Sequence, residues 1–201
     1  MLQYSHNNIL AMASTFGTNA IKFQLYIMLV FDSKHMGEPV AWVIMSRSCA
    51  HDIAYWMRIL LQWVHMKNIE WSLNAFMLDD AGAKIKAIRE VFQCDVYLCS
   101  WHVRRAWLKN LIAKVKEKAI RQEMFDRLGF IMHHSMDEDS TRNAIHIFIE
   151  DFKDTQSSFI EYFKGQWSNR LSMWARCFYT LKHAGQETNG AIESYHLHLK
   201  R

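Results

Sequence analysis

All strand-like runs of apolar residues in this chain lie before residue 100, and the pattern after them is helical. Between Ile9 and Cys99 the apolar residues come in short, β-branched or aromatic runs, which are typical of buried strands. From Val103 onward apolar residues recur at helical spacing instead. The first half must therefore supply any sheet, and the second half predicts an all-helical insertion or cap.

The first half predicts a mixed sheet of the α/β class. Three strand-like runs joined by short turns favour antiparallel neighbours, and after them helices alternate with strands, which favours right-handed crossovers. The predicted strands are 9–12, 23–31, 40–45, 75–78 and 95–99, with residues 37–39 as a turn and helices over 52–67 and from Gly82.

Composition supports a globular domain and excludes several other classes. Of 201 residues 50% are hydrophobic and 22% charged, so a core can form and disorder is not expected. The longest apolar run, Leu25–Phe31, is shorter than the about 20 residues that cross a bilayer, so no membrane partner is expected. Irregularly spaced cysteines with no secretory leader favour a reducing, intracellular compartment. No glycine-rich phosphate loop is found, so we expect no small-molecule cofactor.

Asp79 is the strongest single candidate for a functional residue. It follows the buried run 75–78, and open α/β folds place their sites at the carboxyl ends of strands. Alternatively, Asp79 or Asp80 caps the helix that begins near Gly82. The residues alone leave both interpretations open.

The pair Cys99 and His102 has the spacing of half a zinc site. A structural zinc site needs four ligands, and no second tight pair is present, although Cys94, His133 and His134 could donate. A thiol–imidazole nucleophile is a second interpretation. The simplest interpretation is that Cys99 packs and His102 begins the next helix.

A basic stretch follows, and we predict that residues 102–123 form one long amphipathic helix. Its charged positions are nearly all cationic in a chain whose net charge is only +4. A solvated helix face is the commoner explanation, but such a helix is also a plausible phosphate-contacting surface. The candidate DNA-binding residues are Arg104, Arg105, Lys109, Lys114 and Lys116, with Lys118 and Arg121 farther along.

Several stretches, in order, resemble the transposase domain of Mutator-like elements, including the regulators derived from plant transposases. They are STFGTN, FQLYIMLVFDS, GEPVAWVI, FMLDDAGAKIKAIREVF, VYLCSWHVRR, the pattern at Trp167 and Trp174-Ala175, and TNGAIESYHLHLK. Together they span essentially the whole chain. No single stretch is decisive, but the ordered set is specific.

The resemblance implies a ribonuclease-H-like core, a mixed sheet with flanking helices, in residues 1–102. An all-helical insertion in residues 103–186 interrupts that core, and residues 187–201 supply a C-terminal core helix that carries the last acid. The chain ends soon after this acid, so we expect a truncated helix. We also expect the zinc-binding modules that often flank such transposases to be absent, which places end-specific DNA recognition in doubt.

In the family three acids hold Mg²⁺ or Mn²⁺ for DNA cleavage and strand transfer. Asp79 matches the second acid and Glu193 the third, while Cys99 and His102 match a site-adjacent Cys-x-x-His motif. On its own Glu193 would not indicate a site, because the helix dipole favours an acid in a first turn. The first acid stands directly before Ser-Thr-Phe-Gly-Thr-Asn, and this chain has Ala13 there.

The methyl group of Ala13 cannot ligate a cation. Two-metal phosphodiester chemistry depends on carboxylates that hold both cations, and each ~1.4 kcal/mol of lost stabilisation slows the reaction tenfold. We therefore expect the chain to cleave DNA very poorly or not at all, with metal binding doubtful.

Three functions stay open for a chain with these residues. It is a degenerate transposase domain, a domesticated and non-catalytic DNA- or protein-binding module in transcriptional regulation, or a nuclease in which another ligand replaces the missing acid. DNA is the expected partner, self-association is left open, and the resemblance implies a nuclear location.

Overall fold

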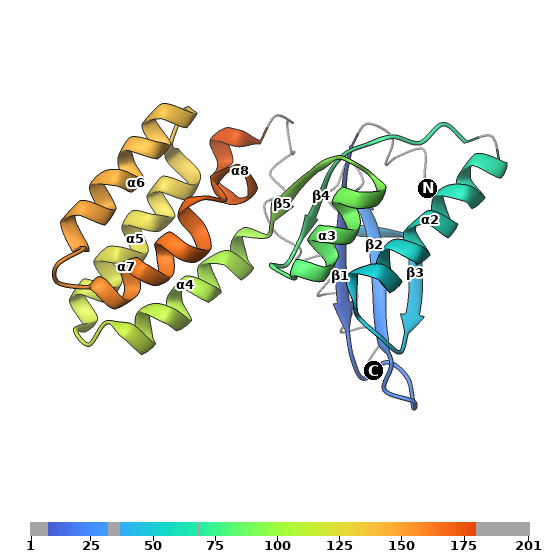
Figure 1. The fold of residues 1–201 in the computed structure, drawn as a ribbon, viewed down its shortest axis with the longest axis horizontal. Coiled ribbons are helices and arrows are strands. Elements are labelled where there is room, and N and C mark those ends of the chain that lie inside the picture. Colours follow the sequence, from blue (N-terminus) through green and yellow to red (C-terminus); the bar gives the residue numbers. More distant parts are fainter. Residues whose placement is uncertain (1–7, 32–36, 68, 180–201) are drawn as a thin grey trace. The chain divides into compact units, whose positions relative to one another are not determined.

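The structure, a computed structural model, describes residues 8–31, 37–67 and 69–179, which fall into two compact units (Figure 1). The first unit reaches Cys99 and the second begins at Ser100. The sequence predicts the change from core to helical segment a few residues later, after His102. The predicted C-terminal segment 187–201 lies outside the described residues.

The first unit contains a five-stranded mixed sheet in the order β3-β2-β1-β4-β5. The two pairs among the first three strands are antiparallel, whereas β4 runs parallel to both β1 and β5. The mixed α/β class predicted from the sequence is confirmed. The strands are β1 (Asn8–Thr15), β2 (Gln24–Phe31), β3 (Gly37–Met45), β4 (Leu73–Leu78) and β5 (Asp95–Leu98).

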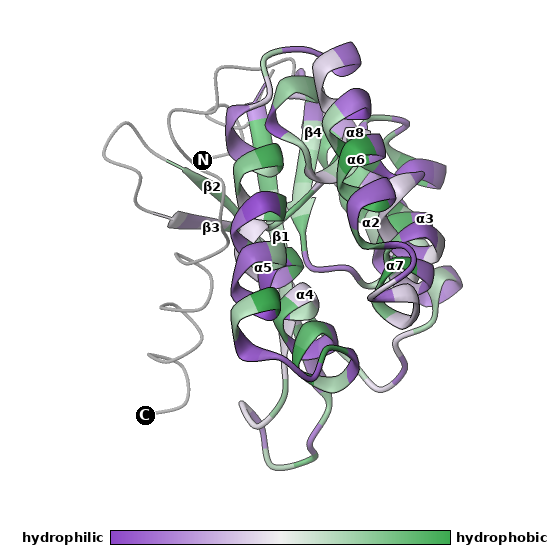
Figure 2. Cartoon of the chain, turned by 90° about the vertical axis from the view of Figure 1, so that its left-hand side faces the viewer, coloured by the Kyte–Doolittle hydropathy of each residue, from purple (hydrophilic) through white to green (hydrophobic). Residues whose placement is uncertain are grey.

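Burial explains why these segments are strands. From Leu25 to Val30 every residue of β2 is buried, so both faces of that strand are covered, and hydrophobic residues also run along β1 and β4 (Figure 2). The prediction of a turn at residues 37–39 is wrong, because Gly37 and Pro39 already pair with β2. Pro39 is tolerated because β3 is an edge strand, where a missing N–H breaks no central ladder.

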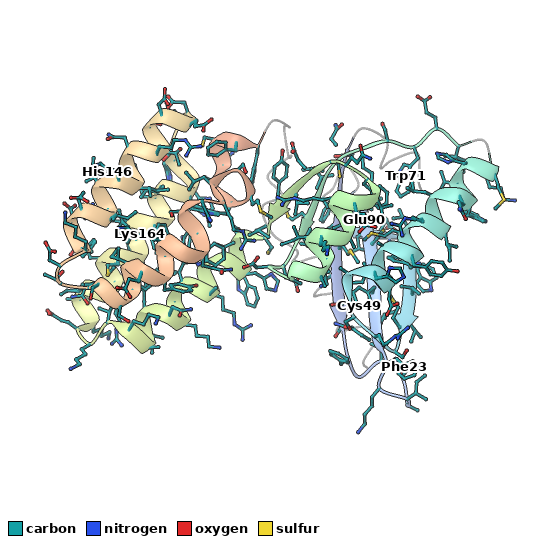
Figure 3. The ribbon with its side chains drawn as sticks, in the orientation of Figure 1. Phe23, Cys49, Trp71, Glu90, His146 and Lys164 are labelled. Carbon is teal, nitrogen blue, oxygen red and sulfur yellow. The ribbon has the colours of Figure 1, made fainter. Side chains whose placement is uncertain are left out.

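Two helices complete the described part of the first unit. Helix α2 (Ala50–Met66) buries Ile53, Ala54, Met57 and Val64. Helix α3 (Gly82–Val91) ends at Phe92, whose ring packs against that of Phe76 in β4 with centroids 4.9 Å apart. Arg58 of α2 and Glu90 of α3 form an ion pair that joins the two helices. Glu90 is labelled in Figure 3.

The described part of the second unit is all-helical, as the sequence predicts. Its α-helices are α4 (Ser100–Lys114), α5 (Lys118–His134), α6 (Glu138–Phe152), α7 (Ser157–Phe163) and α8 (Leu171–Trp174). A π-helical turn, Lys164–Ser168, follows α7, and a 3₁₀ turn, Arg176–Phe178, follows α8. Among the described residues, no helix combines the length and hydropathy needed to cross a membrane.

The single helix predicted over residues 102–123 is wrong. Helix α4 stops at Lys114 and α5 starts at Lys118, with Glu117 in an extended conformation between them. The buried Val115 still donates its N–H to Leu111, at 2.9 Å, before the chain turns. The break lets α5 fold back on α4, where Arg104 of α4 lies over the ring of Phe125 of α5.

Aromatic rings form the core of the second unit. Trp107 of α4 is fully buried, and its ring lies edge-on to those of Trp167 and Trp174, with centroids 6.0 and 5.2 Å away. The indole N–H of Trp174 donates to the carbonyl of Trp167 at 3.0 Å. Because Trp107 is far in the sequence from Trp167 and Trp174, this packing holds α4 against the π-helical turn and α8.

Candidate functional site

Ala13 and Asp79 lie side by side where the carboxyl ends of β1 and β4 adjoin. Strands β1 and β4 are parallel neighbours, and Met12 is in register with Leu78. The next residues are Ala13, still within β1, and Asp79, directly after the end of β4, and neighbouring strands are about 4.8 Å apart. The structure thus brings together the backbone at the two positions that match the first and second acids. Glu193, which matches the third, lies outside the described residues.

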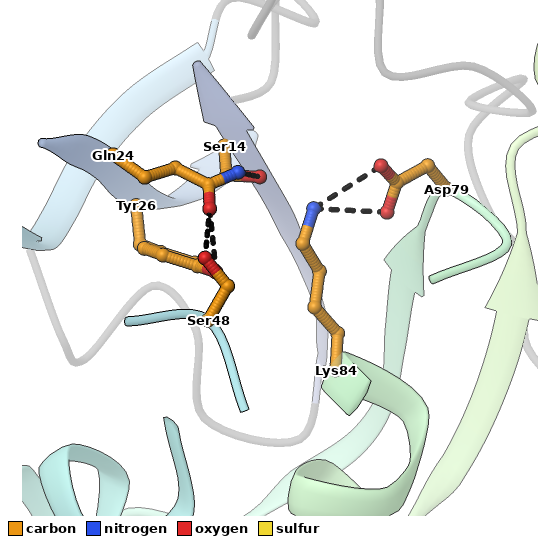
Figure 4. Close-up of polar contacts among 6 residues, drawn as sticks. All are labelled: Ser14, Gln24, Tyr26, Ser48, Asp79 and Lys84. Atoms are coloured by element: carbon orange, nitrogen blue, oxygen red, sulfur yellow. Dashed lines mark hydrogen bonds and ion pairs between the residues drawn. The ribbon is translucent and has the colours of Figure 1, made fainter. Parts of the chain in front are cut away.

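The carboxylate of Asp79 is bound by a lysine. The amine nitrogen of Lys84, on α3, lies 2.9 Å from one carboxylate oxygen of Asp79 and 3.1 Å from the other (Figure 4). The Lys84 side chain is 4% exposed, and that of Asp79 is 33% exposed. A buried ammonium needs a counter-charge, and Asp79 supplies it.

The alternative that an aspartate caps α3 is not observed. The N-cap residue is Ala81, and no side chain makes a capping hydrogen bond there. The backbone carbonyl of Asp79 accepts the Ala81 N–H at 2.8 Å, which turns the chain from β4 towards α3. The side chain of Asp79 is therefore free of the capping role and engaged with Lys84.

A polar network lies beside this ion pair. The Lys84 amine is 5.8 Å from the centre of the Tyr26 ring. The Tyr26 hydroxyl donates to the side-chain oxygen of Gln24 at 3.0 Å, and the Gln24 amide donates to Ser14 at 2.8 Å. Ser48 also donates to the Gln24 oxygen (Figure 4). Burial raises the pKa of Tyr26, and the charge of Asp79 adds to that rise, so the phenol stays protonated.

The side chain at position 13 points to the other face of the sheet. Tyr26, over which Lys84 lies, is paired with Ser14, whereas Ala13 is paired with Ile27. Successive residues of a strand point to opposite faces. Ala13 accordingly packs against the buried cluster that contains Ala11, Leu25, Ile27 and Leu29.

These residues do not fit a divalent metal centre. Position 13 offers no ligand atom, and both oxygens of Asp79 are already held by a cation, the Lys84 ammonium. A metal ion placed on Asp79 would have to displace that ammonium and leave it buried without a partner. Among the residues that the structure describes, no group of three or more His, Cys, Asp or Glu side chains could hold a metal ion.

The Cys-x-x-His pair spans the boundary between the two units. Cys99 is buried and follows β5, and its N–H donates to the carbonyl of Leu78 at 2.9 Å, which continues the pairing of β5 with β4. His102 lies in the first turn of α4, with its ring 4.8 Å from that of Trp101. The interpretation that Cys99 packs and His102 begins a helix agrees with these positions.

The candidate DNA-binding residues differ in their surroundings. The Arg104 guanidinium lies 4.5 Å from the centre of the Phe125 ring, and a Cβ built on Gly129 would be only 2.4 Å from it. Arg104 is thus packed between α4 and α5. Arg105 is exposed and lies over the ring of Trp101, at 5.0 Å. Three further candidates are exposed, namely Lys109, Lys114 and Lys116.

Lys84 is the residue that the sequence does not reveal. It lies on a helix whose apolar residues at 85, 88 and 92 predict the buried face, and a lysine beside them is expected on the solvent side. A signal was nevertheless present, because Lys84 lies five residues after the strand-ending Asp79, on the helix that follows it. Burial of a lysine is exceptional without an acid nearby.

Comparisons with known proteins add no family to this picture. No protein-family model matches the chain, and no curated protein matches it.

Proposed function

We propose that this chain is a non-catalytic, DNA-binding domain of the Mutator-like transposase type. The proposal includes a ribonuclease-H-like core, a helical insertion and a nuclear location. It rests on the ordered stretches described above and on the five-stranded mixed sheet, in which the ends of β1 and β4 adjoin.

One observation carries the non-catalytic part of the proposal. The Lys84 ammonium holds both oxygens of Asp79, and the neighbouring position has only the methyl group of Ala13. The cation bound to the Asp79 carboxylate is thus a lysine side chain of the protein and not a metal ion. A hydrolytic or strand-transfer step needs metals that activate a nucleophile and stabilise a leaving oxygen, and this edge of the sheet does not support their binding.

DNA binding is proposed for the exposed cations of α4 and the segment after it. Arg105, Lys109, Lys114 and Lys116 carry no carboxylate partner among the ion pairs of the described residues. Cations of this kind bind phosphates without reading base sequence, and their binding weakens as salt rises. We leave Arg104 out of this surface because its guanidinium packs against Phe125.

The DNA-binding proposal is tested by gel-shift titration of a duplex at several salt concentrations. Changing Arg105 and Lys109 to Gln should weaken binding and lower the slope of log K against log salt by roughly one for each residue. Lys86→Gln, which removes an exposed cation from α3 instead, is the matched control. Absence of binding at low salt, or an equal effect of the control, would remove DNA binding from the proposal.

The non-catalytic part is tested separately with a labelled duplex in Mg²⁺ and in Mn²⁺. We expect no cleavage above the level of Asp79→Asn, which serves as a background control. Cleavage by the wild-type chain that Asp79→Asn abolishes would show that the site is active and that the ion pair opens.

A further inference from the structure

An open groove lies between α4 and α5 in the second unit. Its volume is about 360 Å³, within the roughly 300–1,000 Å³ that binding pockets occupy. It is lined by Leu108 and Ile112 from α4 and by Lys118, Arg121, Gln122 and Phe125 from α5.

The floor of this groove is aliphatic and exposed. Leu108 and Ile112 lie one helical turn apart, and they are 44% and 58% exposed. The opposite side of α4 is buried through Val103, Trp107 and Leu111, so the two exposed residues are not needed for the core. Contiguous exposed apolar side chains beside polar ones are typical of a surface that a partner covers.

The rim of the groove is positively charged. Two of its six lining residues, Lys118 and Arg121, are cationic, and none is acidic. The two carboxylates that follow Arg121 on α5 are engaged along the helix: Glu123 pairs with Arg127 at 3.8 Å, and Asp126 accepts two hydrogen bonds from the Gln122 amide, at 3.0 and 2.9 Å. The charges on the rim therefore complement an acidic partner.

The floor suits a protein side chain better than a nucleobase. Single-stranded nucleic acids bind by stacking bases on aromatic rings. Leu108 and Ile112 offer no flat ring, and Phe125 already has the Arg104 guanidinium 4.5 Å from its ring centre. Aliphatic anchors beside cations are instead typical of a groove that receives an amphipathic helix.

We propose that the α4–α5 groove binds an acidic amphipathic helix of a partner protein. Apolar residues on one face of that helix pack on Leu108, Ile112 and Phe125, and its carboxylates pair with Lys118 and Arg121. The inference does not rest on the proposed DNA binding, because Arg105 and Lys109 do not line the groove.

The test uses fluorescence anisotropy with a labelled synthetic helix of about 16 residues that has leucine on one face and glutamate elsewhere. One comparison peptide replaces glutamate by lysine, and another replaces leucine by serine. A labelled oligo-dT serves as the nucleic-acid probe. We expect that only the acidic amphipathic peptide binds saturably. We also expect its binding to depend on the residues that line the groove.

Two variants locate the binding. Ile112→Asp should weaken binding of the acidic peptide by roughly tenfold or more, and Arg121→Glu by a comparable factor. Ile147→Asp, at a 46% exposed position of α6 outside the groove, is the matched control and should change little. Unchanged helix content and melting temperature of Ile112→Asp exclude unfolding as the cause.

Several outcomes would overturn the proposal. Equal binding of the lysine peptide would refute the charge complementarity, and equal binding of the serine peptide would refute the apolar anchors. Oligo-dT binding that Ile112→Asp abolishes would assign the groove to nucleic acid. Self-association that the same variant abolishes, measured by sedimentation, would assign it to a second copy of this chain. If changing Arg105 and Lys109 to Gln abolishes duplex binding but leaves binding of the acidic peptide unchanged, the groove proposal is supported independently of DNA binding.

Discussion

The Asp79–Lys84 ion pair predicts an asymmetry between two substitutions. Asp79→Asn leaves the ammonium of Lys84, which is 4% exposed, facing a neutral amide. Lys84→Met removes that ammonium and leaves a carboxylate that is 33% exposed and can be hydrated. Removing the partner of a buried charge is much more costly than replacing the buried charge by an apolar side chain of similar size.

The expected magnitudes follow from these exposures. Breaking a fully buried pair costs about 3–5 kcal/mol. Asp79 is partly hydrated, and the Asn oxygen can still accept one hydrogen bond from Lys84, so we expect Asp79→Asn to lower the free energy of unfolding by about 2–3 kcal/mol. Lys84→Met should change it by less than about 1 kcal/mol, in either direction.

Urea unfolding followed by circular dichroism measures both values, with Lys86→Met as the control for removing an exposed lysine from the same helix. A loss of stability in Lys84→Met as large as that in Asp79→Asn would refute the reasoning. It would mean that Lys84 stabilises the first unit through its packing and not as a buried charge that depends on Asp79.

Three further predictions concern packing and cysteine chemistry. Gly129→Ala should change the stability of the second unit by less than about 1 kcal/mol, because the new Cβ would be 2.4 Å from the tip of the Arg104 side chain, which can shift, while Ala favours the helix over Gly. In an Arg104→Met background, where that tip is absent, the same change should stabilise the unit by about 0.5–1 kcal/mol in thermal melts. Trp107→Ala should cost about 3–5 kcal/mol of unfolding free energy, because Trp107 is fully buried among other aromatic rings. Burial raises the pKa of Cys94 to about 11, so at about pH 9 iodoacetamide should modify the exposed Cys49 well before Cys94, as peptide mass spectrometry would show. Equal labelling of the two cysteines would contradict the burial of Cys94.

The strands of the first unit could be predicted because their buried residues form uninterrupted apolar runs in the sequence. The buried run of β2 needs covering on both faces, and only a strand inside a sheet satisfies that requirement at such a length. The closeness of positions 13 and 79 was expected from the family resemblance and not from the apolar runs, and the parallel pairing of β1 with β4 agrees with it. The apolar runs do not show where strand pairing begins. The sequence therefore predicts a turn at Gly37 and Pro39, which instead pair with β2.

The break between α4 and α5 could not be predicted from spacing. Apolar residues continue at helical intervals through Val115, and no Gly or Pro marks residues 115–117. The break arises from tertiary packing, because α5 folds back on α4 and Arg104 fits against Phe125 and Gly129. The burial of Lys84 could not be predicted for the same reason, because it depends on Asp79, which only the folded chain brings within reach.

Binding of Mn²⁺, followed by electron paramagnetic resonance, tests most directly whether Lys84 prevents Asp79 from holding a metal ion. We expect no tight Mn²⁺ binding to the wild-type chain, because Lys84 holds both carboxylate oxygens of Asp79. Ala13→Asp should not restore binding either, because the side chain at position 13 faces the apolar cluster on the other side of the sheet. Lys84→Met should gain weak Mn²⁺ binding that Asp79→Asn abolishes. Tight Mn²⁺ binding by the wild-type chain that Asp79→Asn abolishes would contradict the account.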